Sequence, residues 1–584
     1  MSQPAGADPR APRDPVATEP AAADATLRVP RPRRWDVPFG EMGEGDLDRL
    51  LGLEPFCSMD PTRFSPAVPL RGVLANDTRL VRFGRGDIVV REGDYGASAF
   101  LIVSGAVRVL AGLPAAMLGR LESRRRGWLS LLAQPWTNAR APEVRDLARA
   151  AHDARVAERR AAAGETRIFL QDVPGVLDRH GSVRLGAGET FGELAALGRT
   201  PRTASVFAEE ESELLEVRWQ GLRELRARDP ALKEFIDRRY RERSLATHLR
   251  ETPLFRHLDP RALEALAQET VFESYGRFDW HGSYRALAGE VEVRLADEPV
   301  IAEEGHYPNG LILIRSGFAR LTRRHGHGQL SLSYIGKGAH YGLEELVANW
   351  RSRQQVPLGR TLRAVGYVDV LRVPTAAVER HVLPALPPEP APAAPGPGGA
   401  GPSDARLPQP LIEFLVDRRF INGTAAMVID LDRCTRCDDC VRACAVAHDG
   451  NPRFLRHGPR QGSLMVANAC MHCADPVCMI GCPTGAIHRD PARGQVVIND
   501  ATCIGCATCA RSCPYDNIQM VEIHDRRGRS LLDEATGAPI LKAAKCDLCI
   551  DQLGGPACQR ACPHDALVRI DLTRPDPLGE WLER

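Results

Sequence analysis

The sequence predicts a multidomain α+β protein: two β-rolls of the jelly-roll type with flanking helices, followed by a small cysteine-rich region. Three observations lead to this fold class. Short alternating strands with glycine turns begin near residue 79 and recur near residue 300. A stretch rich in Pro, Ala and Gly at 383–410 is typical of a linker. Finally, 16 of the 17 cysteines lie between Cys434 and Cys562.

The composition is that of a globular protein and excludes several classes. The length of 584 residues suggests more than two domains. Hydrophobic residues make up 43% and charged residues 26%, which is ordinary for such proteins. The net charge of +1 gives no electrostatic reason to expect binding to DNA or to an anionic membrane. Because no apolar run approaches membrane length, we expect no membrane span.

The N-terminal segment 1–40 is rich in Pro and Ala, and we expect it to be disordered. It contains a twin arginine, Arg33 and Arg34, but no apolar export segment follows. Many cysteines together with no secretion signal favour a compartment that keeps thiols reduced. We therefore expect a cytoplasmic protein.

The first roll is expected over 41–250. Strands and glycine turns occupy 80–109, and the stretch 111–166 is expected to be an insertion with helical periodicity. The segment 219–250 places its apolar side chains on one face, which predicts a helix after the roll.

A short motif near the end of this roll combines groups that suit a phosphorylated sugar. Gly192 begins a short helix whose first backbone N–H groups are available to an anion. Glu193 can accept a hydrogen bond from a sugar hydroxyl, and Arg202 can offer a fork of donors to a phosphate. Each of these residues alone would more often be part of a surface salt bridge.

This motif resembles the phosphate-binding cassette of cyclic-nucleotide-binding domains, as in the regulatory subunits of protein kinase A and the Crp/Fnr regulators. The resemblance implies that Gly192, Glu193 and Leu194 hold the ribose and the phosphate edge. It also implies that Arg202 binds the cyclic phosphate and that Thr203 adds a hydroxyl. The expected regulatory ligand is cyclic AMP or cyclic GMP. The insertion at 111–166 is the departure from the family, since it could reshape or cover the pocket.

A second, degenerate copy of the roll is expected over 251–382. Its strand–turn–strand pattern repeats that of the first roll, which is itself evidence for a shared fold. When the two copies are aligned, Pro357 matches Pro201 and Leu358 falls where Arg202 stands. Without that arginine a buried phosphate would lack its counter-charge. We expect no nucleotide binding there unless Arg360 substitutes.

The cysteines of the region 411–584 fall into four groups of four. Groups one and three have the spacing C-x2-C-x2-C-x3-C, and the other two have a widened gap. This is the spacing with which bacterial ferredoxins hold [4Fe–4S] clusters. The groups are Cys434, Cys437, Cys440 and Cys444; Cys470, Cys473, Cys478 and Cys482; Cys503, Cys506, Cys509 and Cys513; and Cys546, Cys549, Cys558 and Cys562.

The spacing favours clusters over two alternatives. Three thiolates in a tight loop can bind three irons of one cubane, while the fourth, one helical turn away, reaches the other cluster of a pair. Structural zinc needs only four ligands and does not require this repeated run. A disulfide framework suits small secreted domains. The lone Cys57 is expected to be a buried small residue.

The cysteine-rich region resembles the four-cluster electron-transfer subunits of molybdopterin oxidoreductases, such as dimethyl sulfoxide reductase, nitrate reductase and formate dehydrogenase. In that family the outer groups pair with each other, as do the inner groups. The resemblance implies four [4Fe–4S] clusters with these ligands: Cys434, Cys437, Cys440 and Cys562; Cys546, Cys549, Cys558 and Cys444; Cys470, Cys473, Cys478 and Cys513; and Cys503, Cys506, Cys509 and Cys482.

Together the parts predict an electron-transfer protein with cyclic-nucleotide-type regulatory domains and no self-contained catalytic site. Its expected partner is a redox protein, such as a molybdopterin or other oxidoreductase catalytic subunit. One alternative is a Crp/Fnr-like regulator, although no helix-turn-helix follows either roll and DNA binding is not expected. Another is an electron carrier whose rolls are scaffolds without ligand. The C-terminal segment 577–584 is expected to be a docking tail.

Overall fold

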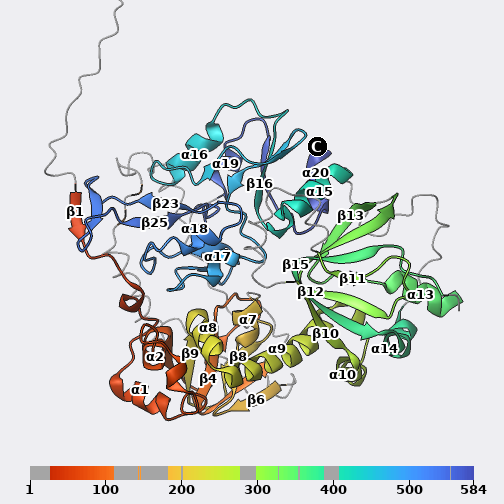
Figure 1. Cartoon of the computed structure of the whole chain (residues 1–584), viewed down its shortest axis with the longest axis horizontal. Coiled ribbons are helices and arrows are strands. Elements are labelled where there is room, and N and C mark those ends of the chain that lie inside the picture. The colour runs from red at the N-terminus through yellow and green to blue at the C-terminus, as the bar shows by residue number, and fades with distance from the viewer. Residues whose placement is uncertain are drawn as a thin grey trace, which may run out of the picture.

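Three folded units make up the computed structural model (Figure 1): the first roll, the second roll and the cysteine-rich region. The structure describes residues 26–110, 143, 145, 182–198, 201–276, 298–326, 328–352, 355–386, 407–550, 552 and 554–584. The predicted insertion at 111–166 therefore lies outside the described residues except for Glu143 and Arg145. The same holds for the linker between 387 and 406.

The first roll is built from two four-stranded antiparallel sheets with the orders β2-β9-β4-β7 and β3-β8-β5-β6. Apolar side chains of both sheets pack between them, and the rings of Phe100 and Phe191 stack with centroids 4.9 Å apart. The strands are β2 Thr78–Phe83, β3 Ile88–Val90, β4 Ser98–Ser104, β5 Ala106–Leu110, β6 Ser182–Gly186, β7 Thr190–Phe191, β8 Ser205–Ala208 and β9 Ser212–Arg218. The helices are α1 Glu44–Leu51, α2 Leu70–Asp77, α7 Glu193–Gly198, α8 Trp219–Arg228 and α9 Pro230–Glu251.

The second roll repeats the first with longer, bent strands in one six-stranded sheet. In both rolls a bend falls at a glycine with positive φ, Gly105 and Gly317, where a side chain would collide with a backbone carbonyl of the neighbouring strand. The strands are β10 Val271–Gly276, β11 Val300–Ala302, β12 Gly310–His325, β13 Gly328–Gly336, β14 His340–Tyr341 and β15 Thr361–Pro374. The helices are α10 Pro260–Glu269, α13 Leu343–Ser352 and α14 Thr375–Ala377.

The cysteine-rich region contains a four-stranded sheet, three antiparallel strand pairs and four short helices that each begin within or beside a cysteine group. The sheet has the order β18-β19-β16-β26, and the pairs are β21-β22, β23-β25 and β17 Phe454–Leu455 with β20 Asn468–Ala469. Its principal elements are α15 Gln409–Asp417, β16 Ala426–Asp430, α16 Asp439–Ala447, β18 Arg460–Gln461, β19 Leu464–Val466, α17 Val477–Ile480, β21 Ile487–Arg489, β22 Val496–Ile498, α18 Thr508–Ser512, β23 Gln519–Glu522, β24 Ser530–Asp533, β25 Leu541–Ala544, α19 Ala557–Arg560, β26 Leu567–Ile570 and α20 Asp576–Leu582.

The prediction of disorder up to residue 40 is wrong for residues 26–40. Residues Thr26–Val29 form strand β1, which pairs in parallel with β24 (Figure 1). Leu27 and Val29 pack against a small apolar cluster of the cysteine-rich region, and Arg31 donates to the carbonyl of Gly505 at 2.9 Å. Apolar burial and backbone pairing thus order a segment whose composition suggested a flexible tail. Residues 1–25 lie outside the described part.

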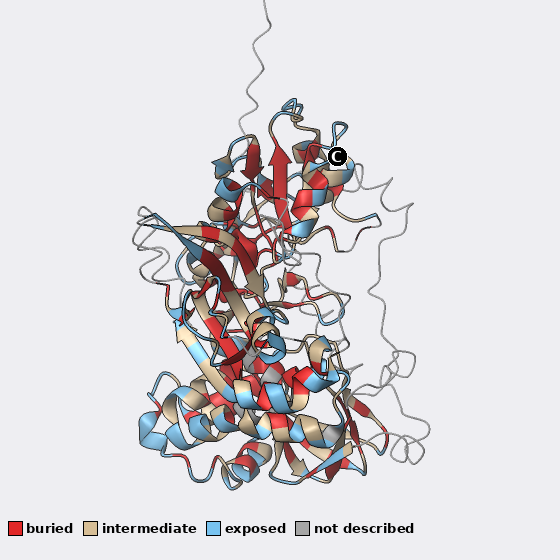
Figure 2. Ribbon diagram, turned by 90° about the vertical axis from the view of Figure 1, so that its right-hand side faces the viewer, coloured by how far each residue is buried: buried red, intermediate tan, exposed pale blue. Residues whose placement is uncertain are grey.

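The prediction of a C-terminal docking tail is also wrong, because the tail belongs to a core. Helix α20 buries Leu578 and Trp581, the latter only 3% exposed, against α15. The same core contains Tyr334 of the second roll, whose hydroxyl donates to the carbonyl of Leu572 at 2.8 Å. In Figure 2, buried residues appear in red on the elements beside the C-terminus. The second roll and the cysteine-rich region are therefore packed together and not merely tethered by the linker.

The sequence predicts no membrane span. Within the part of the chain that the structure describes, no helix combines the length and apolar character required to cross a bilayer.

Replacing Trp581 with Ala tests whether the tail is part of the core. We expect a loss of about 3–5 kcal/mol in the free energy of unfolding, because a large buried ring would leave a cavity. The measurement is the midpoint of anaerobic thermal unfolding. The matched control is Glu580→Ala, at an exposed neighbouring position. Equal unfolding midpoints for both variants would mean that the tail does not contribute to the core and is free to act as a docking tail, as the sequence predicted.

Candidate functional site

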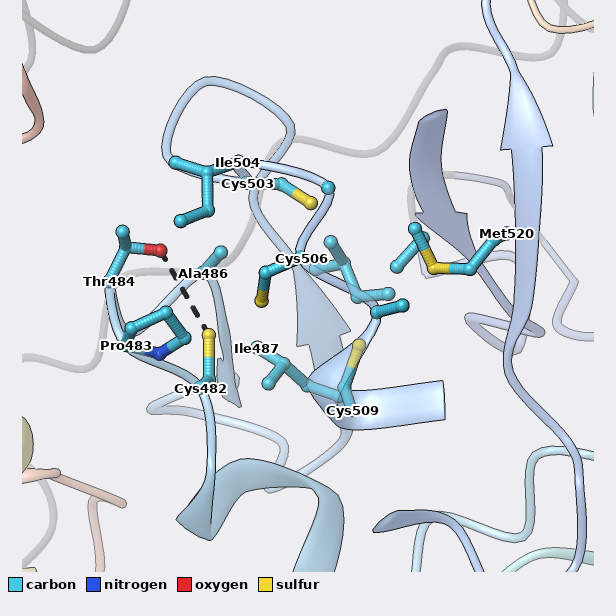
Figure 3. A pocket seen from close by; sticks show the side chains of 14 residues that line it. Cys482, Pro483, Thr484, Ala486, Ile487, Cys503, Ile504, Cys506, Cys509 and Met520 are labelled. Carbon is cyan, nitrogen blue, oxygen red and sulfur yellow. Dashed lines mark hydrogen bonds between the residues drawn. The ribbon is translucent and has the colours of Figure 1, made fainter. Parts of the chain in front are cut away.

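The clearest site is a cavity lined by cysteines of two different groups. Cys482, from the second group, meets Cys503, Cys506 and Cys509 of the third group around one enclosed cavity. Figure 3 shows their four side chains extending into the same space. The wall of the cavity is completed by apolar side chains and by Thr484, whose hydroxyl lies 3.9 Å from the Cys482 sulfur. This is one of the four predicted ligand sets.

A second cavity brings together the first and fourth cysteine groups. Cys434, Cys437 and Cys440 line it with Cys562, which comes from near the end of the chain. Helix α16 positions Cys440, and the turn after α19 positions Cys562. A second predicted ligand set is thus also assembled.

The other two sets are also close in space. Burial raises the pKa of the Cys473 thiol, and the nearby thiols Cys470, Cys478 and Cys513 raise it further. Burial likewise raises the pKa of Cys444, with further contributions from Cys546, Cys558 and Cys549. Two of the four groupings that the family resemblance implies thus line cavities, and the thiols of the other two lie near one another.

The surroundings of these sulfurs fit metal-bound thiolates. Backbone N–H groups of Arg453, Asn517, Leu548 and Ala557 donate to Cys444, Cys513, Cys546 and Cys549, respectively, over 3.3–3.5 Å. Such donors stabilise negative charge on sulfur. None of the 17 cysteines is in a disulfide, and Cys57 is exposed, so the prediction that it is buried is wrong. Burial raises the pKa of Cys509 to about 12, so iron binding there must displace a proton.

The four sets have an order in space. Cys546 of one set and Cys470 of the next are near enough for their charges to interact. At one end, Cys437 is exposed. At the other end, the set around Cys482 is next to the first roll, where Arg218 donates to the carbonyl of Thr484 at 3.1 Å. One end of the series thus faces the surface and the other faces a roll.

In the first roll, the predicted cassette residues line one cavity of about 230 Å³. Gly192, Glu193, Arg202 and Thr203 line it together with Arg250 of α9, and the rest of the lining is apolar. This volume is near the lower limit of small-molecule sites, about 300 Å³. The fifth predicted residue, Leu194, lies in α7, and its side chain is outside the described part.

The guanidinium of Arg202 donates hydrogen bonds to two uncharged groups. It is 7% exposed and donates to the carbonyl of Gly192 at 2.9 Å and to the hydroxyl of Ser98 at 3.3 Å. Burial lowers the pKa of Arg202 to about 10, although the carboxylates of Glu216 and Glu193 act against this. The guanidinium is therefore still charged at neutral pH and suits an anionic ligand.

The second roll has a leucine where the first has this arginine. In the first roll, Arg202 exchanges backbone hydrogen bonds with Gly93 and Asp94; in the second, Leu358 exchanges the same pair with Gly305 and His306. The alignment of Leu358 with Arg202 is therefore confirmed. Leu358 is buried in the apolar core of its roll.

Arg360 does not replace the missing charge. It points away from that core, and its guanidinium lies 3.3 Å from the carboxylate of Glu344 in an exposed ion pair. The structure therefore gives the second roll no counter-charge at the position that Arg202 holds in the first.

Two described residues of the insertion hold it against the cysteine-rich region. Glu143, 4% exposed, pairs with Arg145 at 2.6 Å and with Arg453 at 2.5 Å. Arg145 also pairs with Asp500. Burial raises the pKa of Glu143, but the charges of Arg453 and Arg145 lower it by more, so it lies below its ordinary value. Because Arg453 also donates to Cys444 through its backbone, the insertion is anchored at a ligand loop.

Comparison with known proteins agrees with these two kinds of site. The family model of the 4Fe-4S dicluster domain matches residues 462–529, and that of the cyclic nucleotide-binding domain matches residues 164–229. Electron transport protein HydN of Escherichia coli (strain K12) is 34% identical over 167 residues, which cover 26% of this chain and 91% of HydN. The iron-sulfur protein of Rhodospirillum rubrum is 33% identical over 158 residues, 24% of this chain and 79% of that protein.

The chain belongs to the iron–sulfur electron transport proteins. The beta subunit of NADH-dependent phenylglyoxylate dehydrogenase from Aromatoleum evansii is 33% identical over 166 residues, 27% of this electron transport protein and 33% of that subunit. Among solved structures, the electron transport protein aligns with cAMP-bound PfPKA-R (141-441). The alignment covers 59% of the electron transport protein and 86% of PfPKA-R, with 14% identity and a TM-score of 0.19.

Two cationic residues beside the clusters of this electron transport protein were missed from the sequence. Arg569, on β26, donates to the sulfur of Cys546 at 3.0 Å and to the carbonyl of Cys470 at 3.2 Å, so it lies between two ligand sets. Lys545 is buried and donates to the carbonyl of Cys546. A positive charge beside a cluster favours its reduced form. The only sequence signal was the position of Lys545 directly before a cysteine group.

Replacing Glu143 with Gln tests the anchoring of the insertion. We expect a loss of about 3 kcal/mol in the free energy of unfolding, because Arg453 would lose its buried counter-charge while Arg145 would keep only Asp500. The measurement is the midpoint of anaerobic urea unfolding, followed by cluster absorbance, with the exposed Glu41→Gln as the control. If the two variants have the same urea midpoint, the ion pair between Glu143 and Arg453 does not hold the insertion in place.

Proposed function

We propose that this electron transport protein carries four [4Fe–4S] clusters in a row and passes single electrons along them. The observation that supports the proposal is the presence of two cavities, each lined by three cysteines of one group and one of another, with the other predicted ligands near one another. The protein supplies insulation and tunes the potentials, while the clusters carry the electrons. The proposed location is the cytoplasm, where thiols remain reduced.

The order of the sets favours a particular path for electrons. The set with the exposed Cys437 is the natural place for a redox partner to approach, because electron exchange requires short distances. The proposed partner is an oxidoreductase catalytic subunit. The beta subunit of phenylglyoxylate dehydrogenase among the relatives supports this type of assignment.

The first roll is proposed to bind one cyclic nucleotide and to regulate electron flow. Its support is the cavity where Arg202, Glu193 and Thr203 meet. The second roll is proposed to be a scaffold, because Leu358 stands in place of the arginine and its sheet shares a core with α15. We propose a boundary between the two rolls near residue 250 and a linker over 383–410 that precedes the cluster domain.

Iron content tests the number of clusters. The protein purified without oxygen should contain roughly 16 irons, and Cys506→Ala should lower this by about one to four, as one cluster is damaged or lost. The exposed Cys57→Ala is the matched control and should keep the full content. About eight irons in the unaltered protein, or tightly held zinc in the cysteine groups, would contradict the proposal.

Calorimetric titration of the full chain with cyclic AMP and cyclic GMP tests regulation. We expect one nucleotide per chain, because the second roll has Leu358 at the position that Arg202 holds in the first. Arg202→Leu should weaken binding roughly 100-fold, since charge-assisted hydrogen bonds to the phosphate are lost. The exposed Arg85→Leu should bind normally. If neither nucleotide binds the unaltered protein, both rolls are scaffolds; two nucleotides per chain would contradict the role assigned to Leu358.

A further inference from the structure

A cavity of about 600 Å³ lies between the first roll and the cysteine-rich region. The roll contributes Tyr95, Arg202 and Arg218 to its wall, and the cysteine-rich region contributes Thr484 and Arg489. The volume is well within the range of small-molecule sites, roughly 300–1,000 Å³, and such sites often lie between domains. None of the predicted functions makes use of this space.

The cavity lies between the two sites already described and shares a wall with each. Arg202 lines both this space and the nucleotide cavity of the roll. Thr484 and Ile487 line both this space and the cavity of Cys482, Cys503, Cys506 and Cys509. A molecule bound here would therefore touch the cassette arginine on one side and the wall of a cluster site on the other.

The lining is electropositive. Among the described lining residues, five arginines face two carboxylates. One of the carboxylates, Glu216, pairs with Arg79 at 2.7 Å, and Arg218 is neutralised by Asp77 behind the wall at 2.6 Å. Arg91 has only a distant carboxylate neighbour, Asp94 at 4.0 Å. An excess of positive charge remains in a partly buried space, which favours an anionic ligand. The five arginines are Arg79, Arg91, Arg202, Arg218 and Arg489.

The same wall carries aromatic rings, each with a guanidinium over its face. Arg79 lies 4.7 Å from the centroid of Phe39, and Arg489 lies 5.0 Å from that of Tyr95. Tyr95 is fixed by its backbone N–H, which donates to the carbonyl of Pro491 at 2.9 Å across the interface. Rings and guanidinium planes together form flat surfaces on which another aromatic ring can stack.

We propose that this interface cavity is a second ligand site, which takes a phosphorylated aromatic molecule of mononucleotide size. Its phosphate would be held by the arginines, with Arg91 as the one with the weakest existing partner. Its ring would lie against Tyr95 and Phe39. The site is distinct from the nucleotide cavity of the roll, because Glu193 and Thr203 line only the other cavity, and the two sites share Arg202.

The test uses the anaerobically purified full chain and flavin mononucleotide as the probe. Quenching of the probe's fluorescence on titration should saturate at one probe per chain. Riboflavin has the same ring without the phosphate and should bind at least tenfold more weakly. Arg91→Gln should weaken binding of flavin mononucleotide roughly tenfold through a lost charge-assisted contact. Tyr95→Leu removes the ring but keeps the backbone hydrogen bond to Pro491, and should also weaken binding.

Two controls separate this site from its neighbours. Arg85→Gln removes a positive charge from an exposed position of the same roll, and Glu193→Gln changes a residue that lines the nucleotide cavity but not the interface cavity. Both should bind flavin mononucleotide as the unaltered protein does. No saturable quenching, equal binding of riboflavin, or a loss in Glu193→Gln with none in Arg91→Gln would each overturn the proposal.

Discussion

The fourth thiol of each cysteine set comes from a different group, and the architecture of the cysteine-rich region follows from this constraint. Cys562 must reach Cys434, and Cys444 must reach Cys546, so the two ends of the region are drawn together. The backbone hydrogen bonds between β16 and β26 also join these two ends of the region. Thiols that are buried together repel one another once ionised, so the fold and the iron are expected to depend on each other.

The rest of the molecule is arranged around this region. The second roll shares a core with α15 and α20, strand β1 covers an edge near Gly505, and Glu143 holds the insertion against Arg453. The first roll contacts the cysteine-rich region mainly through polar groups, as Arg218 does with Thr484. One roll is thus fixed by apolar burial and the other by directional contacts around a cavity, and polar contacts of this kind are the easier to rearrange.

The sequence alone predicted the features that depend on local spacing. The four cysteine groups, the repeated roll and the equivalence of Leu358 with Arg202 are all visible in short motifs. It did not predict features that depend on the tertiary fold. Arg569 lies on an ordinary strand, and only the pairing of β26 brings it between two cysteine sets. Trp581 belongs to a segment that seemed free because its partners in α15 and the second roll are distant in sequence.

Helix α9 connects the two rolls as one continuous element. Its 22 residues span about 33 Å, at roughly 1.5 Å per residue, and it runs from one roll to the other (Figure 1). Ile236 near its start is buried in the core of the first roll, and Leu249 near its end is buried in that of the second. One continuous helix is thus packed into a core at each end. If the first roll tilted relative to the cysteine-rich region, either α9 would bend or the second roll would be distorted, because the second roll is packed against that region.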